Sequence, residues 1–300
     1  MYGIFSIHRQ LAKHNMTLRS ANGTRSDCNM GGVAHVAVVP SSINERYRRA
    51  LVLWLGEDNI RTVEKGYISD RIKPEQEVWT GTFNKLWLFN LTEFDKIIML
   101  DADILIRSNI MHWFNYSTHP TPCAIQARDD MSWNTGAMVI QPDTQVFEQM
   151  LSQLGSIQKY ENGQVYSRDP LIGGYSDQDF ITAFFLNGNN KQAAKQRCVM
   201  PSEAAVLTSS LRESKAFDYY NKYRPWVYQT VHFTVKKPWR SSHFFTKKEN
   251  STRVKQTHPF ICSLLREWNE SVRGIEEYYD IIPPLENDYM ASCNNTAGTA

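Results

Sequence analysis

Two aspartates that directly follow an apolar run carry the clearest chemistry in this sequence. Asp101 and Asp103 come after residues 96–100 and are separated by Ala102. The apolar run predicts a buried strand, and residues two apart in a strand point to the same face. Both carboxylates can therefore reach one point at the carboxyl end of the strand, where open α/β sheets bind ligands. Two hard oxygen ligands there suit Mn²⁺ or Mg²⁺ holding a phosphate-bearing substrate.

Chance also produces such short acidic pairs, and the sequence contains a second one. Asp177 and Asp179 flank Gln178, but no apolar run of strand length precedes them. We therefore interpret only the first pair as a metal site.

Four other short clusters are candidates to act together with this pair. Each lies on, or at one end of, a predicted helix or strand. They are Lys85, Asn134-Thr135-Gly136, Asp177-Gln178, and His232 with Lys237. Taken singly, each has a plainer interpretation: Asp177 suits a helix N-cap, and His232 suits a buried core histidine. Their number and order, rather than any one of them, favour a common site.

The elements that would position these residues alternate between strands and helices. Apolar and β-branched runs predict strands at residues 34–39, 60–63, 96–100, 124–127, 136–140 and 231–233. Apolar residues at helical spacing predict helices at residues 2–14, 43–55, 85–91, 146–154, 178–186 and 258–280. This alternation predicts an α/β fold with a mainly parallel, mixed sheet flanked by helices.

The composition gives no reason to expect a nucleic-acid partner or a membrane span. Of the 300 residues, 42% are hydrophobic, which is enough for a full core. The formal net charge is +2, and Lys and Arg are scattered along the chain. No apolar run approaches the length that is needed to span a bilayer.

The cysteines and the glycosylation sequons point to different compartments. Five cysteines lack metal-ligand spacing, and their odd number shows no disulfide framework. We therefore expect buried free thiols, with one bridge if the compartment is oxidising. Asn-x-Ser/Thr sequons are more numerous than the composition would give by chance, and they are used only in secretory chains. They begin at Asn15, Asn22, Asn90, Asn115, Asn250, Asn269 and Asn294, and they favour a Golgi or other secretory location over the cytoplasm.

In order and spacing, these motifs resemble those of the family 8 glycosyltransferases, the glycogenin-like group. The matching segments are Phe83-Asn84-Lys85-Leu86, Leu100-Asp101-Ala102-Asp103, Asn134-Thr135-Gly136, Asp177-Gln178 and His232 through Trp239. The resemblance implies a GT-A fold and a retaining transferase that uses a UDP-sugar and Mn²⁺. It also implies a glycan or protein acceptor, and it is compatible with a homodimer.

The resemblance further implies a metal set and a donor-binding set. Asp101, Asp103 and His232 would hold the ion, which stabilises the negative charge that develops on the UDP. Lys237 would meet the leaving phosphate, and Lys85 would lie over the diphosphate or the donor sugar. The full donor-binding set comprises Lys85, Ala102, Asn134, Thr135, Gly136 and Lys237.

The expected catalytic residues are Asp177 and Gln178, close to the face from which a retaining reaction proceeds. Retaining hydrolases use two close carboxyl groups. Because Asp177 is the only convincing carboxylate apart from the metal ligands, we favour front-face attack over a covalent glycosyl-enzyme intermediate.

One departure from the family pattern concerns the first strand. Family members open with a strand whose end holds the nucleotide base, whereas this sequence matches from the following helix, residues 2–14. We therefore expect that strand to be missing and the catalytic domain, residues 1–245, to be N-terminally incomplete. A helical extension at residues 246–286 and a flexible tail at residues 287–300 are expected to follow.

Two other functions are alternatives to the transferase. A catalytically impaired family member would act as a scaffold or glycan-binding module, which the absent strand favours. A haloacid-dehalogenase-type phosphatase also carries Asp-x-Asp after a strand. That family needs Thr or Val where Ile104 stands and a later acidic motif that this sequence lacks.

Overall fold

The computed structural model describes the elements that surround most of the predicted site. The described residues are 7, 9–11, 13, 33–64, 68, 77–116, 118, 121–126, 133–161, 176–186, 198–201, 203–208, 228–234 and 259–273. Lys237 and the predicted domain boundaries at residues 245 and 286 lie outside them, so these predictions stay predictions.

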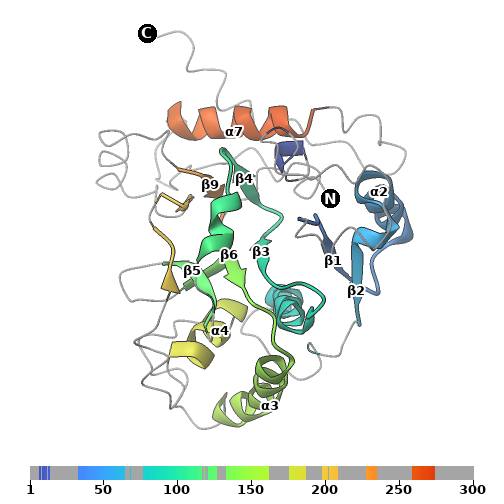
Figure 1. The fold of residues 1–300 in the computed structure, drawn as a ribbon, viewed down its shortest axis with the longest axis vertical. Helices are drawn as coiled ribbons and strands as arrows, with labels where there is room; N and C mark the ends of the chain where they lie inside the picture. Colours follow the sequence, from blue (N-terminus) through green and yellow to red (C-terminus); the bar gives the residue numbers. More distant parts are fainter. Residues whose placement is uncertain are drawn as a thin grey trace, which may run out of the picture.

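The strands of the described residues form three sheets (Figure 1). They are β1 (Ala37–Pro40), β2 (Ile60–Val63), β3 (Ile97–Leu100), β4 (Ile104–Ile106), β5 (Cys123–Gln126), β6 (Trp133–Ile140), β7 (Cys198–Val199), β8 (Ala205–Leu207) and β9 (Thr230–His232). One sheet pairs β1 with β2, the second has the order β3-β6-β5-β7, and the third has the order β4-β9-β8.

Helices flank these sheets, which confirms the predicted α/β class. The α-helices are α2 (Glu45–Leu55), α3 (Thr144–Glu161), α4 (Asp177–Leu186) and α7 (Pro259–Ser271). Among the described residues, the 3-10 helices are η2 (Glu57–Asn59), η4 (Glu77–Asn90) and η5 (Met111–Asn115). The segment predicted as a helix at residues 85–91 belongs to η4, and Lys85 is therefore on a 3-10 rather than an α-helix.

The sheets are mixed, as predicted, although the strands that border the site pair antiparallel rather than parallel. β3 pairs antiparallel with β6, and β6 pairs antiparallel with β5. An all-apolar strand is typical of parallel sheets, but apolarity does not encode strand direction. The short connection between β5 and β6 suits an antiparallel pair, because parallel strands need a longer crossover.

β6 is the centre of the fold, because both of its faces are buried. All eight of its residues are buried, and the side chains of residues 137–140 alternate between two hydrophobic clusters. Met138 and Ile140 pack with η4, α3 and α4, whereas Ala137 and Val139 pack with β4 and η5. This strand therefore fixes the relative positions of the helices and of the turn that follows β3.

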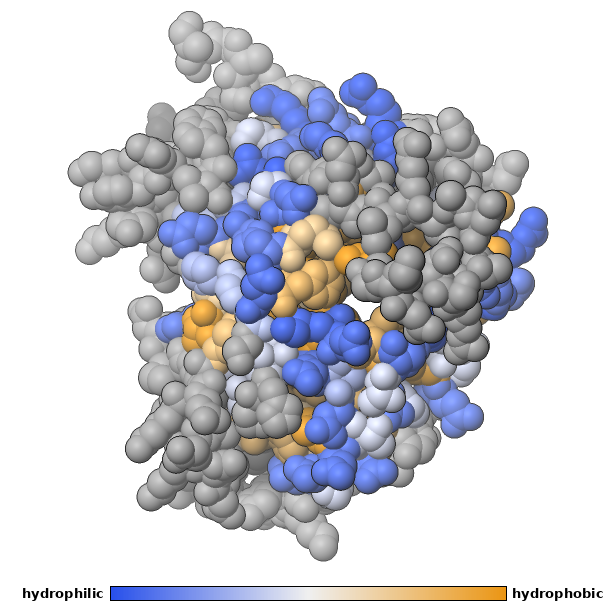
Figure 2. Space-filling view, in the orientation of Figure 1, coloured by the Kyte–Doolittle hydropathy of each residue, from blue (hydrophilic) through white to orange (hydrophobic). Residues whose placement is uncertain are grey.

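A cavity of 1230 Å³ lies between the β1–β2 sheet and the sheet that contains β3. Residues 36–40 and 97–100 line it, and these segments share no ladder hydrogen bonds among the described residues. Figure 2, in the orientation of Figure 1, shows hydrophobic side chains near the centre of the face that is drawn. β3 was predicted to be fully buried, but only Met99 is, since the strand borders this cavity. Among the described residues, β1 and β3 thus belong to separate sheets.

A disulfide joins the second sheet across two neighbouring strands. Cys123 of β5 and Cys198 of β7 are paired in register and bonded through their sulfurs. Cys262 on α7 is disulfide-bonded as well. The expectation of buried free thiols is therefore wrong for these three cysteines, whereas the bridge expected for an oxidising compartment is present. The pairing itself could not be predicted, because cysteine spacing does not show which distant strands become neighbours.

Helix α7 lies across one end of the molecule (Figure 1). Its Glu267 carboxylate accepts from the Arg107 guanidinium at 3.0 Å, which ties the helix to the end of β4. None of the helices among the described residues combines the length and the apolarity that are needed to cross a membrane.

The disulfide should contribute strongly to stability. We expect the paired substitution Cys123→Ala and Cys198→Ala to lower the free energy of unfolding by about 4 kcal/mol, because the bridge closes a long loop. Urea denaturation in an oxidising buffer measures this and leaves the disulfide of Cys262 intact. A loss below about 1 kcal/mol would contradict the prediction.

Candidate active site

Three residues that lie far apart in the sequence meet at the carboxyl end of β3. One ligand atom from each of Asp101, Asp103 and His232 lies within 4.8 Å of the others. His232 Nε2 is 3.2 Å from Asp103 Oδ1 and 3.9 Å from Asp101 Oδ2. Asp103 and His232 are buried. The predicted metal set is thus brought together as one cluster.

Backbone hydrogen bonds hold this cluster in place from both sides. The Asp101 N–H donates to the Gly136 carbonyl at 2.7 Å, which anchors the turn to β6. The Phe233 N–H donates to the Asp103 carbonyl at 3.0 Å, and Ile104 pairs with His232 in the β4–β9 ladder. The turn after β3 is therefore tied to β6 and β9 at the positions that carry the side chains of the cluster.

Lys85 on η4 lies between two carboxylates of the site. Its Nζ is 2.9 Å from Asp101 Oδ2 and 3.0 Å from Asp177 Oδ2. The ammonium also donates to the Thr135 carbonyl at 3.4 Å. The lysine therefore connects η4, the end of β3 and the start of α4.

Burial and charge shift the pKa values of these groups in different directions. Burial opposes the charge on Lys85, but the Asp101 and Asp177 carboxylates outweigh it and raise the lysine pKa above its usual range. Burial also opposes the charge on Asp177, but Lys85 and hydrogen bonds from Thr82, Lys85 and Thr135 lower the pKa of that carboxyl. The pKa of Asp101 is raised, first by burial and then by the neighbouring carboxylates of Asp103 and Asp177.

Asp177 is not the helix N-cap that its position at the start of α4 allowed. Its Oδ2 accepts from the Thr135 hydroxyl at 2.8 Å and from Lys85. Capping falls instead to Ser176 and Asp179: the Ser176 N–H and hydroxyl donate to the Asp179 carboxylate, and the Asp179 N–H donates back. The second acidic pair is therefore divided between the site and helix capping.

The segment Asn134-Thr135-Gly136 forms the floor of the site. Asn134 Oδ1 is 2.8 Å from His232 Nδ1, and Asn134 Nδ2 donates to Gln178 Oε1 at 3.2 Å. A Cβ on Gly136 would lie 2.1 Å from His232 Cε1, so the imidazole needs a glycine beneath it. All of the predicted donor-binding residues on β6 thus contact either the predicted metal ligand His232 or the predicted catalytic residues Asp177 and Gln178.

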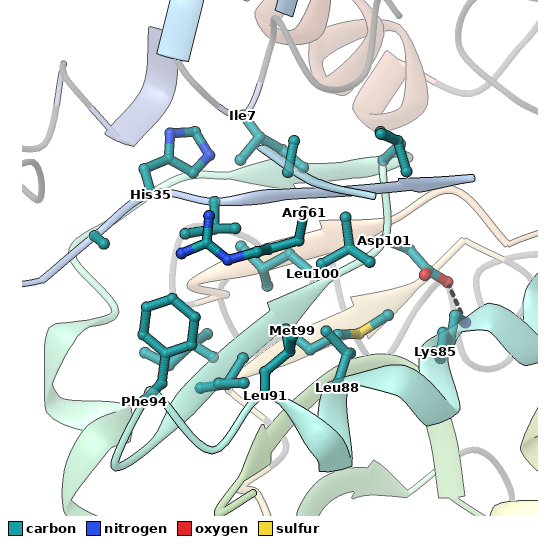
Figure 3. Close-up of a pocket in the computed structure, with 18 of the residues that line it drawn as sticks. Ile7, His35, Arg61, Lys85, Leu88, Leu91, Phe94, Met99, Leu100 and Asp101 are labelled. Atoms are coloured by element: carbon teal, nitrogen blue, oxygen red, sulfur yellow. Dashed lines mark hydrogen bonds and ion pairs between the residues drawn. The ribbon is translucent and has the colours of Figure 1, made fainter. Parts of the chain in front are cut away.

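The cavity between the sheets reaches the cluster at its polar end. Lys85, Asp101, Ala102 and Asp103 line it there, next to Thr82. Figure 3 shows Lys85 facing Asp101 at one end, with Leu88, Met99 and Leu100 along the wall beyond them. The space beside the metal set is therefore part polar and part apolar, as a substrate with a charged and an uncharged part requires.

The donor set fits a divalent cation. Lys85 pairs with the carboxylates of Asp101 and Asp177, whereas the Asp103 carboxylate faces His232. Buried carboxylates need compensating charge, and the pKa of Asp101 is raised by its burial first and then by the neighbouring carboxylates. Two carboxylate oxygens and an imidazole nitrogen suit Mn²⁺.

Sequence reasoning missed one member of the site. The Thr82 side chain hydrogen-bonds to Asp177 and helps to keep it ionised. Thr82 precedes Lys85 by three residues, and in a 3-10 helix residues with that spacing lie on the same side. Thr82 was missed because the predicted helix began at Lys85 and left Thr82 outside it.

Comparison with known proteins points to transferases of sugars. No family model matches the chain. Over 152 residues it is 30% identical to UDP-glucuronate:xylan alpha-glucuronosyltransferase 1 of Arabidopsis thaliana, a match that covers 49% of this chain and 22% of that protein. Over 184 residues it is 26% identical to Glucose N-acetyltransferase 1 of Gibberella zeae, covering 55% and 36% of the two chains. The chain thus spans only a fifth to about a third of the length of these relatives.

The fold is similar to that of solved glycosyltransferases. The glycosyltransferase GlyE of Streptococcus pneumoniae TIGR4 superposes with a TM-score of 0.53 at 13% identity. The match covers 93% of this chain and 59% of GlyE, and it bears on the fold alone.

Lys85→Met should expose the electrostatic role of the lysine. Without the ammonium, burial raises the pKa of Asp177 above its unfolded value, so its charged form destabilises the fold. We expect the free energy of unfolding to fall by about 3–5 kcal/mol at pH 7. This loss should become smaller toward pH 5, because the Asp177 carboxyl takes up a proton there. Denaturant unfolding at both pH values measures this. Lys96→Met is the matched control, because the Lys96 ammonium bonds only to the Phe114 and Tyr116 carbonyls in the described structure. An equal loss at both pH values would argue against the assignment.

Gly136→Ala should displace the His232 imidazole. We expect the affinity for Mn²⁺ to fall by about tenfold or more, because the ring can no longer keep its place beside Asp103. Isothermal titration with Mn²⁺ measures this, and circular dichroism checks that the fold persists. In Gly81→Ala the new methyl group meets no atom within 4 Å, and the affinity should be unchanged. Equal Mn²⁺ affinities for the two variants would show that the close approach of Gly136 to His232 does not matter for metal binding.

Proposed function

We propose that this glycosyltransferase, which has the GT-A fold and resembles the glycogenin-like family 8, transfers a sugar from a UDP-sugar to a glycan or protein acceptor with retention of configuration. The observation that carries the proposal is the convergence of Asp101, Asp103 and His232 beside Lys85, at the polar end of a large cavity. A divalent cation bound by these three side chains would supply charge stabilisation to the diphosphate as it leaves.

The protein's own residues would then divide the remaining work. We assign Lys85 to binding of the donor, because it lines the cavity next to Asp101. We assign the leaving phosphate to Lys237, which follows His232 by five residues in the sequence. The Asp103 carboxylate and the imidazole are buried, so their positions are fixed before the donor arrives.

The surroundings of Asp177 support front-face attack rather than a covalent intermediate. Its Oδ2 is engaged by both Lys85 and Thr135, and its pKa is lowered. A carboxylate that is held in this way is a weak nucleophile, but it is well suited to accept hydrogen bonds from sugar hydroxyls. Gln178 is half-buried at the start of α4 and bonded to Asn134, where it would border the same sugar.

We propose a hexose, glucuronate or xylose as the transferred sugar and UDP-glucuronate as the first donor to examine. Support comes from the relative whose name specifies UDP-glucuronate and xylan. The second relative is named for a different group, so a panel of donors is needed rather than one.

We also propose a location in the secretory pathway, with the Golgi as the favoured compartment. The sequons support it, and so do the disulfide between Cys123 and Cys198 and the disulfide bond of Cys262. Disulfides persist mainly in oxidising compartments.

Release of UDP in the presence of Mn²⁺ tests the proposed reaction. We expect turnover of at least one donor among UDP-glucuronate, UDP-glucose, UDP-galactose and UDP-xylose. Asp103→Asn should lower kcat/KM by about 10²-fold or more, because it removes one charged oxygen from the metal set. Asp58→Asn, an exposed site on η2, is the control and should leave turnover unchanged.

Two results would count against the transferase. Turnover that survives Asp103→Asn would show that the cluster is not the metal site. Binding of sugars without turnover of any donor would favour the scaffold or glycan-binding alternative.

A further inference from the structure

Asn134 is surrounded by partners that leave its side chain a single orientation. Its Oδ1 accepts from the Gly136 N–H at 3.1 Å and lies 2.8 Å from His232 Nδ1, while its Nδ2 donates to Gln178 at 3.2 Å. The side chain is only 7% exposed, so water is a poor substitute for these partners.

The backbone contact decides which end of the amide is the oxygen. A backbone N–H is a donor only, so the atom that faces Gly136 must be the acceptor oxygen. That same oxygen faces His232 Nδ1, which must therefore carry a hydrogen to donate. The amide thus selects the tautomer of a neutral His232 ring.

The consequence appears on the other side of the ring. With the hydrogen on Nδ1, the Nε2 lone pair of the neutral ring points at Asp103 Oδ1 at 3.2 Å and lies 3.9 Å from Asp101 Oδ2. In the neutral ring, three electron-pair donors then face one another, an arrangement that a bound divalent cation makes favourable. The missing Cβ of Gly136 lets the ring lie in this position.

We propose that Asn134 is a positioning residue for the metal site: it fixes the His232 tautomer so that Nε2 is the ligand atom. This inference rests on the proposed metal-dependent function for its purpose, but not for its geometry. It gives Asn134 a task distinct from contact with the donor sugar, since its oxygen already serves two internal donors.

Nuclear magnetic resonance of the full chain with ¹⁵N-labelled histidine tests this directly. With ¹¹³Cd²⁺ as a diamagnetic probe, we expect one-bond coupling from the metal to Nε2 of His232 and a hydrogen on Nδ1. A His232→Gln sample assigns the signal. Coupling to Nδ1 instead of Nε2 would overturn the inference.

Substitutions of Asn134 separate positioning from packing. We expect Asn134→Ala to weaken Mn²⁺ binding by about 10- to 100-fold and to mix the two tautomers. Asn134→Asp keeps the acceptor oxygen and should retain the Nδ1–H tautomer. Asn59→Ala also removes one side-chain hydrogen bond, to the Leu55 carbonyl at 2.7 Å, and should leave both readouts unchanged. Unchanged affinity and tautomer in Asn134→Ala would also overturn the inference.

The same experiment distinguishes failure of the proposed function from failure of this inference. If neither ¹¹³Cd²⁺ nor Mn²⁺ binds the unaltered protein, the metal-dependent function fails. The ¹⁵N shifts of the neutral ring without metal still report the tautomer. A hydrogen on Nδ1 in the unaltered protein, lost in Asn134→Ala, would then uphold the positioning role, and a hydrogen on Nε2 would refute it.

Discussion

The ion pairs of Lys85 with Asp101 and Asp177 are the interaction on which the site depends. They join a 3-10 helix, the end of a strand and the start of a helix that lie far apart in the sequence. All three side chains are largely removed from water, so separating the charges would leave unpaired buried ions. The position of η4 is therefore coupled to the geometry of the metal set through Asp101.

β6 supports the same arrangement from below. Its buried side chains hold two hydrophobic clusters together, and its first residues present Asn134, Thr135 and Gly136 to the site. One short segment thus orients the imidazole, hydrogen-bonds Asp177 and leaves room for the ring. Because β6 contributes both to the hydrophobic core and to the site, substitutions of its core residues should also alter the geometry of the site.

The sequence predicted the members of the site better than their contacts. Asp101 and Asp103 could be identified because they directly follow the apolar run of β3, although the structure places them in a turn and not in the strand itself. The partner of Asp177 could not, since its ion pair with Lys85 depends on how η4 packs against α4. Strand direction around β3 and the bridge between Cys123 and Cys198 were missed for a similar reason: apolarity and spacing do not encode which distant segments become neighbours.

The central claim is that Asp101, Asp103 and His232 bind one divalent cation between them. Crystals grown with Mn²⁺ and measured at the manganese absorption edge test it most directly. We predict a single strong anomalous peak at about 2.0 to 2.2 Å from an oxygen of each aspartate and from Nε2 of the histidine. An anomalous map without a peak among these three residues, from crystals in which Mn²⁺ is bound at another place on the protein, would contradict the account.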